Sequence, residues 1–409
     1  MHNLNSPKVS VLIPTRERPD TLVKSLKTVV NQSYSNLEII VSDNASSPET
    51  EAVVRSFECP RIRYFNTGKR ISMSHNFEFA LSKATGDWIA AIGDDDGLLP
   101  GGIARAVELL QASGVEAMGS LQSYYVWPNK DWVDGSILSV PMAKGVSFKN
   151  AKEAIRLSVT GHLGYVELPM LYTGGMISSK VIAKVKAAND GAFFNSQIPD
   201  CYSAFAVCSV IDRYVFTQEP FAIAGSSKHS NGGNLLRLKG TAFLTEGNIP
   251  FHPDIPLPEI GTLTFSIPAL VYESYLQTQF LHGDFAHIKP ADQLELILNA
   301  TPIGRDILLE WAKTFAAKHN FDCEPIVAKA ARAPLNRRLA LGLQTFENVR
   351  DRYRIDSSLG LEINDVYEAS IVAATIMKTR PSKLTSYRRL LSRRFTKRAQ
   401  PSLTSHQPT

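Results

Sequence analysis

The stretch that decides the fold is Gly86-Asp87-Trp88-Ile89-Ala90-Ala91-Ile92-Gly93-Asp94-Asp95-Asp96-Gly97-Leu98-Leu99-Pro100. Its residues 88–92 predict a buried strand that runs directly into three consecutive carboxylates, Asp94 to Asp96, here called the acidic run. Adjacent carboxylates repel one another unless a cation or hydrogen-bond donors neutralise them. A divalent ion such as Mg²⁺ or Mn²⁺, which binds carboxylate and phosphate oxygens, would suit this position. An acidic turn that only caps the next helix is the alternative, because Asp-Gly is a common turn signal.

The chain before the acidic run alternates short apolar strands with amphipathic helices. Strands are predicted at residues 9–13, 37–41 and 61–65, and helices at residues 21–31, after Ser47-Pro48, after an N-cap at Ser74, and at residues 102–111. Such alternation predicts an α/β fold with a mostly parallel sheet flanked by helices. Because ligands bind beyond the carboxyl ends of strands in such sheets, we expect Thr15, Asp43 and the acidic run to meet in one crevice.

The remainder of the chain divides into a mixed and a helical part. Residues 115–126, 174–177 and 214–216 are predicted to be extended, and residues 151–159 helical. The polar residues 225–234 are typical either of a lid over a ligand or of a surface linker. Beyond Pro258 the pattern is mainly helical, with turns predicted at Gly283, Pro302, Pro325 and Pro334. We therefore predict an α/β domain at 1–240, a helical C-terminal domain at 241–375 and a partly disordered basic tail at 376–409.

Composition narrows the function classes. With 409 residues, 44% of them hydrophobic and 20% charged, the chain is typical of a soluble globular protein of two domains. It shows neither an apolar run long enough to span a bilayer nor the apolar core of a signal peptide at its start. Its four cysteines form no CxxC pair, which argues against a zinc site and for reduced thiols in the cytosol.

The positive charge is a property of the C-terminus. Nine Lys and Arg residues lie between Lys378 and Arg398, and taking them from the net charge of +5 leaves a body of charge −4. A mildly acidic body disfavours nucleic acid as a partner. Residues 387–395 alternate basic pairs with Leu and Phe, which predicts either peripheral contact with an anionic membrane or a solvated tail or oligomer contact.

Several motifs occur in a fixed order along residues 7–125. They are Pro14-Thr15-Arg16-Glu17-Arg18 after the first strand, Asn31-Gln32 at a helix end, Asp43-Asn44-Ala45-Ser46 after the second strand, Asn76 in a helix, and the acidic run. In this order they resemble the inverting nucleotide-sugar transferases of glycosyltransferase family 2, and a weaker resemblance extends to about residue 235. The resemblance implies that residues 1–240 form a catalytic domain of the GT-A fold, a Rossmann-like mixed, mostly parallel sheet flanked by helices.

The resemblance also implies an activity and its partners. The implied reaction moves a sugar from a nucleoside-diphosphate sugar, with a UDP-sugar as first choice, to a hydroxyl of a glycan or lipid-linked saccharide, with help from Mn²⁺ or Mg²⁺. The protein would work in the cytoplasm, peripherally at the inner face of the membrane. A sugar-nucleotidyltransferase is a rival reading, but its glycine-rich phosphate loop is missing from residues 14–18. A non-catalytic nucleotide-binding protein that recruits a partner is the second rival.

Site residues follow from the matched motifs. For nucleotide binding the resemblance points to Pro14, Thr15, Arg18, Asp43, Asn76 and Asp94, and for the metal to Asp95 and Asp96, with His229 of the polar loop as a further ligand. Lys228 in the same loop could close over the diphosphate. In the family an Asp usually stands where this chain has Gly93, so the division of roles between Asp94 and Asp96 is open.

An inverting reaction also needs a general base for the acceptor hydroxyl. The family places it at a helix start about a hundred residues past the metal site, where this chain has Ile198-Pro199-Asp200. Asp200 is therefore the predicted base, with Asp212 and Asp190 as the next candidates. The alternative is that Asp200 only caps its helix.

Overall fold

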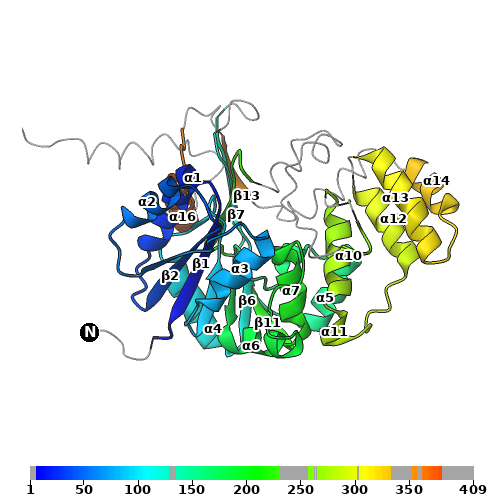
Figure 1. The fold of residues 1–409 in the computed structure, drawn as a ribbon, viewed down its shortest axis with the longest axis horizontal. Coiled ribbons are helices and arrows are strands. Elements are labelled where there is room, and N and C mark those ends of the chain that lie inside the picture. The colour runs from blue at the N-terminus through cyan, green and yellow to red at the C-terminus, as the bar shows by residue number, and fades with distance from the viewer. Residues whose placement is uncertain are drawn as a thin grey trace, which may run out of the picture.

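An eight-stranded mixed sheet forms the centre of the computed structural model, which describes residues 6–128, 135–230, 257–261, 263, 265–301, 304–332, 352–356 and 362–379 (Figure 1). Its strand order is β3-β2-β1-β4-β10-β6-β11-β9. The first four neighbours are parallel, and their bounds are β1 (Val9–Thr15), β2 (Leu37–Asp43), β3 (Ile62–Asn66) and β4 (Trp88–Ala91). All seven residues of β1 and of β2 are buried, and both strands are mainly apolar, although Ser10 interrupts β1 and Glu38 interrupts β2.

Helices cover this parallel half in the order the sequence predicts. They are α1 (Pro19–Val30), α2 (Pro48–Arg55), α3 (Met73–Ser82) and α4 (Gly102–Ser113). One prediction is wrong in detail: the N-cap of α3 is Ser72, whose hydroxyl accepts a 3.1 Å hydrogen bond from the His75 amide, and not Ser74. Ser74 already lies in the first helical turn, where its hydroxyl donates to the backbone oxygen of Ser196.

The other half of the sheet is mixed. Its strands are β6 (Ala117–Ser120), β9 (Val146–Asn150), β10 (Gly175–Ser178) and β11 (Arg213–Thr217), and its helical elements are α5 (Ala151–Val159), η1 (Tyr165–Glu167), α6 (Ser179–Ala188) and α7 (Pro199–Ser209). Strand β10 is antiparallel to both of its neighbours, β4 and β6. The predicted α/β architecture with a mostly parallel sheet is confirmed.

A second sheet was not anticipated from the sequence. Its order is β13-β8-β7-β12-β5, formed by β5 (Gly97–Leu98), β7 (Ser123–Val126), β8 (Ile137–Pro141), β12 (Ala222–Ser226) and β13 (Arg352–Asp356). Helix α16 (Val366–Thr379) packs beside α1, where Lys24 forms a 2.8 Å ion pair with Asp365 (Figure 1). The domain division at residue 240 stays a prediction, but β13 and α16 pack against the N-terminal part of the chain.

The described part beyond β12 is mainly helical, as predicted. It contains α10 (Ile267–Gln277), α11 (Gln279–His282), α12 (Pro290–Ala300), α13 (Arg305–Lys318) and α14 (Glu324–Arg332). Residues of α10, α12 and α13 share one apolar core with α5 and α7. Pro325 lies inside α14 and does not form the predicted turn. Pro302, Pro334, residues 231–234 and most of the basic tail lie outside the described residues.

No helix in the described part of the chain is long and apolar enough to cross a membrane.

Candidate active site

The predicted site lies at the carboxyl ends of β1, β2 and β4. In the parallel register Thr15 is opposite Asp43, and β4 pairs with the other side of β1 before leading into the acidic run. Thr15, Asp43 and the three acids of the run are all buried, each with at most 5% of its surface exposed. The parallel topology thus brings polar residues that are far apart in sequence to one edge of the sheet.

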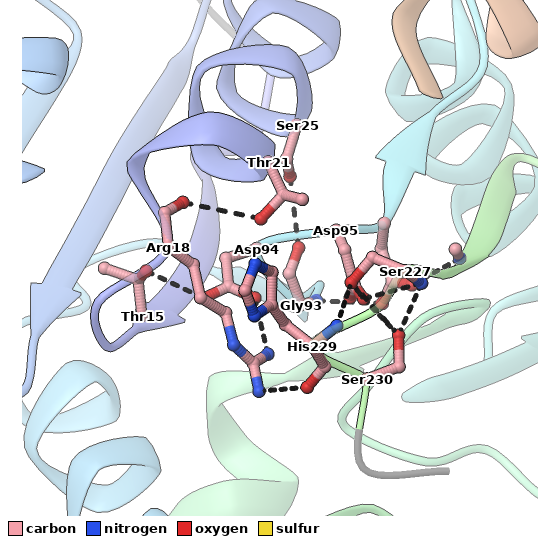
Figure 2. Close-up of polar contacts among 12 residues, drawn as sticks. Thr15, Arg18, Thr21, Ser25, Gly93, Asp94, Asp95, Ser227, His229 and Ser230 are labelled. Atoms are coloured by element: carbon pink, nitrogen blue, oxygen red, sulfur yellow. Dashed lines mark hydrogen bonds and ion pairs between the residues drawn. The ribbon is translucent and has the colours of Figure 1, made fainter. Parts of the chain in front are cut away.

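Asp94 is held by the turn after β1. Its Oδ2 accepts a 2.7 Å hydrogen bond from the Thr15 hydroxyl, and its Oδ1 a 2.9 Å bond from the Arg18 guanidinium. Arg18 also donates to the backbone oxygen of His229 at 2.5 Å, so it lies between Asp94 and the segment that follows β12 (Figure 2). Burial lowers the pKa of Arg18, but the charges of Asp94 and Asp95 outweigh this effect and raise the pKa above its ordinary value.

The segment 225–230 surrounds Asp95 and Asp96. Asp95 Oδ2 accepts a 2.7 Å hydrogen bond from the Ser227 hydroxyl and a further bond from Ser230 (Figure 2). Asp96 Oδ1 accepts a 2.7 Å bond from the Gly225 amide, and a Cβ at Gly225 would lie 1.8 Å from the Asp95 backbone oxygen. Only glycine permits this close approach of β12 to the acidic run.

The acidic run carries more buried negative charge than the described residues around it neutralise. Burial and the neighbouring Asp95 raise the pKa of Asp96 to about 7, and burial also raises the pKa of Asp94 against the opposing effect of Arg18. Within the described ranges, no group of three or more His, Cys, Asp and Glu side chains could hold a metal ion. A divalent ion at Asp95 and Asp96 therefore stays a prediction.

Asp43 has its own set of partners. Its Oδ2 accepts hydrogen bonds from the Tyr64 hydroxyl at 2.6 Å and from the Asn66 amide at 3.2 Å, and its Oδ1 from the Ser46 amide at 3.1 Å. Burial, together with Asp43, raises the pKa of Tyr64 to about 12, so this phenol stays a donor at neutral pH. The carboxylate is thereby fixed in orientation at the end of β2.

Asn76 lies under β2. Its side-chain oxygen accepts a 2.6 Å hydrogen bond from the Ser42 hydroxyl, and its amide donates to the Ser42 backbone oxygen at 3.3 Å. Asn76 thus supports the strand end next to Asp43, and direct contact of Asn76 with a nucleotide stays a prediction.

Glu17 joins the turns after β1 and β2. Its backbone takes a left-handed φ of 54°, its amide donates to the Ser46 hydroxyl at 2.8 Å, and its carboxylate pairs with Arg70 at 2.8 Å. Burial lowers the pKa of Arg16, and the neighbouring Arg70 and Arg18 lower it further. Three guanidinium groups therefore gather at the edge of the crevice, where an anionic ligand would be favoured.

Asp200 lies in the first turn of α7, one position after Pro199. The N-cap residue of α7 is Ile198, so Asp200 is not the capping residue. Asp200 Oδ2 accepts a 3.2 Å hydrogen bond from the Tyr165 hydroxyl. Burial raises the pKa of Asp200, and the amides at the helix start and Tyr165 offset part of this effect. The other candidates, Asp190 and Asp212, are exposed and lie after α6 and before β11.

Tyr172 lies close to both the acidic run and Asp200. Burial raises its pKa well above the ordinary value, and the charges of Asp96, Asp95 and Asp200 raise it further. Tyr172 is thus close to both groups of acids, in a loop between η1 and β10.

Lys228 and His229 lie near Asp20 in the first turn of α1. The His229 Nε2 is 3.6 Å and the Lys228 Nζ 3.7 Å from Asp20 Oδ2. The predicted roles of His229 as a metal ligand and of Lys228 over a diphosphate stay predictions.

Sequence reasoning missed Ser227, Ser230, Thr173, Tyr64 and Tyr165 as partners of the acids. Each is a common residue on a strand, on a 3₁₀ turn or in a loop, and none carries a local pattern. The one available signal was the polar composition of residues 225–234, which is typical either of a lid over a ligand or of a surface linker.

The N-terminal part of the chain is similar in sequence to known glycosyltransferases. Residues 10–159 match the family model described as Glycosyl transferase family 2. A GalNAc(5)-diNAcBac-PP-undecaprenol beta-1,3-glucosyltransferase of Campylobacter jejuni is 37% identical over 105 residues, which are 25% of this chain and 34% of that protein. The UDP-Glc:alpha-D-GlcNAc-diphosphoundecaprenol beta-1,3-glucosyltransferase WfaP of Escherichia coli is 26% identical over 133 residues, 32% of this chain and 51% of that protein. The chain thus spans about a third to a half of the length of these relatives.

Solved structures are similar at low sequence identity. The crystal structure of S. aureus TarS 1-349 in complex with UDP-GlcNAc gives a TM-score of 0.45 at 11% identity, over 83% of this chain and 92% of that one. The mannosyltransferase PcManGT from Pyrobaculum calidifontis, in complex with GDP-Man and Mn2+, gives a TM-score of 0.41 at 16% identity, over 84% and 88%.

Proposed function

We propose that this chain, whose residues 10–159 match the model described as Glycosyl transferase family 2, is a glycosyltransferase of that family and that it moves a sugar from a nucleoside-diphosphate sugar to a hydroxyl group of a lipid-linked saccharide or another glycan. The observation that carries the proposal is that Asp43 and the acidic run lie buried together at the carboxyl ends of parallel strands. The names of the two relatives, both of which act on undecaprenol-diphosphate saccharides, support the acceptor class.

The donor would lie along the carboxyl edge of the sheet. Asp43, fixed by Tyr64 and Asn66, accepts hydrogen bonds from an N–H group of the nucleobase. Thr15 and Asp94 bind the ribose beside it, and Pro14 shapes the backbone of this turn. The guanidinium of Arg18 faces the diphosphate. A UDP-sugar is the donor we propose first, because the relative from Escherichia coli is named for UDP-Glc.

A divalent cation is part of the proposal. Mn²⁺ or Mg²⁺, held by Asp95 and Asp96 together with the donor, would neutralise negative charge on the leaving nucleoside diphosphate. The chain prepares this position by keeping both carboxylates buried and oriented by Ser227 and the Gly225 amide. His229 is a third candidate ligand, and its ring would have to leave Asp20 to reach the acidic run.

Asp200 is the proposed general base. It takes the proton from the acceptor hydroxyl while that oxygen forms a bond to the anomeric carbon. The bond from the anomeric carbon to the phosphate oxygen breaks with its electron pair, so the configuration inverts. The raised pKa of Asp200 brings this carboxylate closer to a value suited to proton abstraction near neutral pH. Tyr165 keeps the carboxylate oriented.

The place of action follows from the acceptor. A lipid-linked saccharide is presented at a membrane surface, so we propose that the protein works in the cytoplasm, peripherally at the inner face of the membrane. The basic tail that would contact anionic lipids begins at the end of α16 and otherwise lies outside the described residues.

The test is a transfer assay with a synthetic polyprenyl-diphosphate-linked N-acetylhexosamine and a panel of UDP-glucose, UDP-N-acetylglucosamine and GDP-mannose. We expect one donor to yield product with Mn²⁺. Asp200→Asn should lower kcat by about 10²–10⁴ while it leaves donor binding intact. Asp212→Asn and Asp190→Asn are matched controls with expected wild-type activity.

Two outcomes would change the proposal. Loss of activity in Asp212→Asn or Asp190→Asn, but not in Asp200→Asn, would move the general base to that residue. Nucleotide binding without transfer or donor hydrolysis under any condition would favour the non-catalytic recruitment protein instead.

A further inference from the structure

Strand β9 forms an outer edge of the eight-stranded sheet, and in the described part of the chain β11 is its one neighbouring strand. Just before β9 begins, the backbone oxygen of Gly145 accepts a 2.9 Å hydrogen bond from the Gln218 amide. Antiparallel strands hydrogen-bond at every second residue, so Gly145 and each second residue after it face β11. The amides and carbonyls of Val146 and Phe148 therefore point away from the sheet, where no described residue binds them.

Two apolar side chains of β9 are also open to solvent. Three large apolar side chains are exposed in the described part of the chain: Val146 at 57%, Phe148 at 54% and Phe280 at 48%. Val146 and Phe148 are two positions apart and so lie on the same face of the strand. The Cζ atom of Arg213 lies 5.1 Å from the centre of the Phe148 ring, yet more than half of this side chain stays exposed. An edge strand with free main-chain groups and exposed apolar side chains is a template for pairing with another chain.

The opposite edge of the same sheet, β3, is better protected. Arg63 on that strand pairs with Glu38 at 2.9 Å, and the Lys83 Nζ lies 5.5 Å from the centre of the Phe65 ring. Each apolar side chain of β3 is at least partly buried. Charged side chains on an edge strand oppose pairing between copies of a protein. The difference between the two edges indicates that β9 is the edge that takes a partner strand.

We propose that β9 pairs with β9 of a second copy of this chain, antiparallel about a two-fold axis, so that the two eight-stranded sheets become one. The outward main-chain groups of both copies meet when the axis passes between the two Ser147 residues. Val146 then lies opposite Phe148 of the second copy, and Phe148 opposite its Val146. Each of these residue pairs exchanges both of its N–H···O bonds, and the apolar side chains cover one another across the axis.

The charge on β9 fits this register. Lys149 is the one charged residue of the strand, and it lies opposite Gly145 of the second copy, so it does not face its own counterpart. Its ammonium group is also paired with Glu167 of its own chain at 2.7 Å. The next register that aligns outward groups places Val146 opposite Asn150 and loses one apolar contact on each side of the axis.

This inference goes beyond the proposed function and does not depend on it. Three strands, β10, β6 and β11, separate β9 from β4, which leads into the acidic run. The donor site that we propose is therefore not part of the contact between the two copies.

Sedimentation velocity of the full chain at concentrations of about 1–100 µM tests the pairing. We expect a reversible equilibrium of monomer and dimer, because a short interface gives a weak complex. Phe148→Lys places a charge beside the second copy's Val146 and should raise the Kd of the dimer about tenfold or more. Phe280→Lys is the matched control, since it makes the same exchange at the exposed phenylalanine of α11 and should leave the Kd unchanged. Both side chains are exposed, so neither substitution should change the unfolding temperature of the monomer much. A wild type that stays monomeric throughout this range, or a dimer that survives Phe148→Lys, would overturn the proposal.

A cysteine at the axis tests the register. In the proposed dimer the two Ser147 residues form a non-hydrogen-bonded pair with Cα atoms about 4.5 Å apart, which is within reach of a disulfide. Ser147→Cys should therefore yield a covalent dimer under mild oxidation, seen by electrophoresis without reductant. Lys149→Cys is the control, because its two copies would lie four positions apart along the strands, roughly 13 Å, and should not be cross-linked. Cross-linking of Ser147→Cys that is no greater than that of Lys149→Cys or of the wild type would contradict the register.

Discussion

Removal of the Arg18 guanidinium is the most informative perturbation of the crevice. Arg18 pairs with Asp94 at 2.9 Å, and it also donates to the backbone oxygen of His229. In the variant Arg18→Met, which has an uncharged, unbranched side chain, Asp94 retains the Thr15 hydroxyl as its one donor among the described residues. The Asp94 side chain is 4% exposed, so water cannot replace the missing partner.

The expected magnitude follows from this burial. Removing one partner of a fully buried ion pair costs about 3–5 kcal/mol. Because the Arg18 side chain is 24% exposed and Thr15 remains, we expect a smaller loss, of about 2 kcal/mol in the free energy of unfolding. With an unfolding entropy of about 2.1 cal/mol/K per residue and a cooperative unit of roughly 300 residues, the unfolding temperature should fall by about 3 °C.

Thermal unfolding followed by circular dichroism measures this loss, and a double-mutant cycle assigns it to the pair. The neutral double variant Arg18→Met/Asp94→Asn should be less destabilised than the sum of the single variants, by about 1–2 kcal/mol. The pH dependence has a definite sign. Because the pKa of Asp94 is already raised, the unpaired acid in Arg18→Met takes up a proton as the pH falls, and the loss of stability should shrink with falling pH.

Two results would refute this reasoning. An unchanged unfolding temperature in Arg18→Met would show that the pair contributes nothing to stability. Strict additivity of the two substitutions would show that Arg18 acts through His229 or the surrounding backbone rather than through Asp94.

Three further predictions concern other acids. Transfer should fail as the pH falls through the raised pKa of Asp200. Tyr165→Phe should move this acid limb of the kcat profile to higher pH, because the Tyr165 hydroxyl lowers the pKa of Asp200. An acid limb that does not move would show that Tyr165 does not influence the group that titrates. Burial raises the pKa of Glu38, but its hydrogen-bond donors outweigh this effect and bring the pKa down to about 2. Glu38→Gln should therefore lower the unfolding temperature at pH 7, and the difference between wild type and variant should shrink as the pH falls from about 4.5 towards 2. Equal differences at all pH values would show that the negative charge of Glu38 does not contribute to stability. Tyr64→Phe should raise the Kd for UDP about tenfold by freeing the Asp43 carboxylate, which calorimetry would detect, and an unchanged Kd would remove Tyr64 from the site.

The parallel half of the sheet could be predicted because its signals are local. Strands β1 and β2 are mainly apolar, and the polar residues at their carboxyl ends must lie at the same edge once the strands are parallel. The meeting of Thr15 with Asp94 follows from that topology, without any pattern that links residues 79 positions apart.

The partners of the acidic run could not be predicted because they depend on long-range pairing. Strand β12 pairs with β7 and β5, and only this pairing brings Ser227 and Ser230 to Asp95. Strand β13 is five residues long and pairs with β8 across more than 200 positions. Short strands of this kind have no helical or alternating signature that sets them apart from loops.

The surroundings of Gly93 also depend on contacts that are distant in sequence. The sequence position of Gly93 indicated a missing acid, but only the loop between η1 and β10 shows that a tyrosine oxygen fills the space. The Ser72 cap of α3 differs from the predicted cap by two residues, because two serines near a helix start are equivalent until the backbone geometry is known.

Binding of nucleoside diphosphates tests the donor site most directly. We would measure the unfolding temperature of the full chain with UDP, GDP, CDP and dTDP, each with Mn²⁺ or with EDTA, and repeat the screen with Asp43→Asn. A ligand that binds only the native state raises its stability by mass action. We predict a rise with one nucleotide, most of it dependent on Mn²⁺ and lost in Asp43→Asn. No rise with any nucleoside diphosphate in either condition would contradict the proposed donor site.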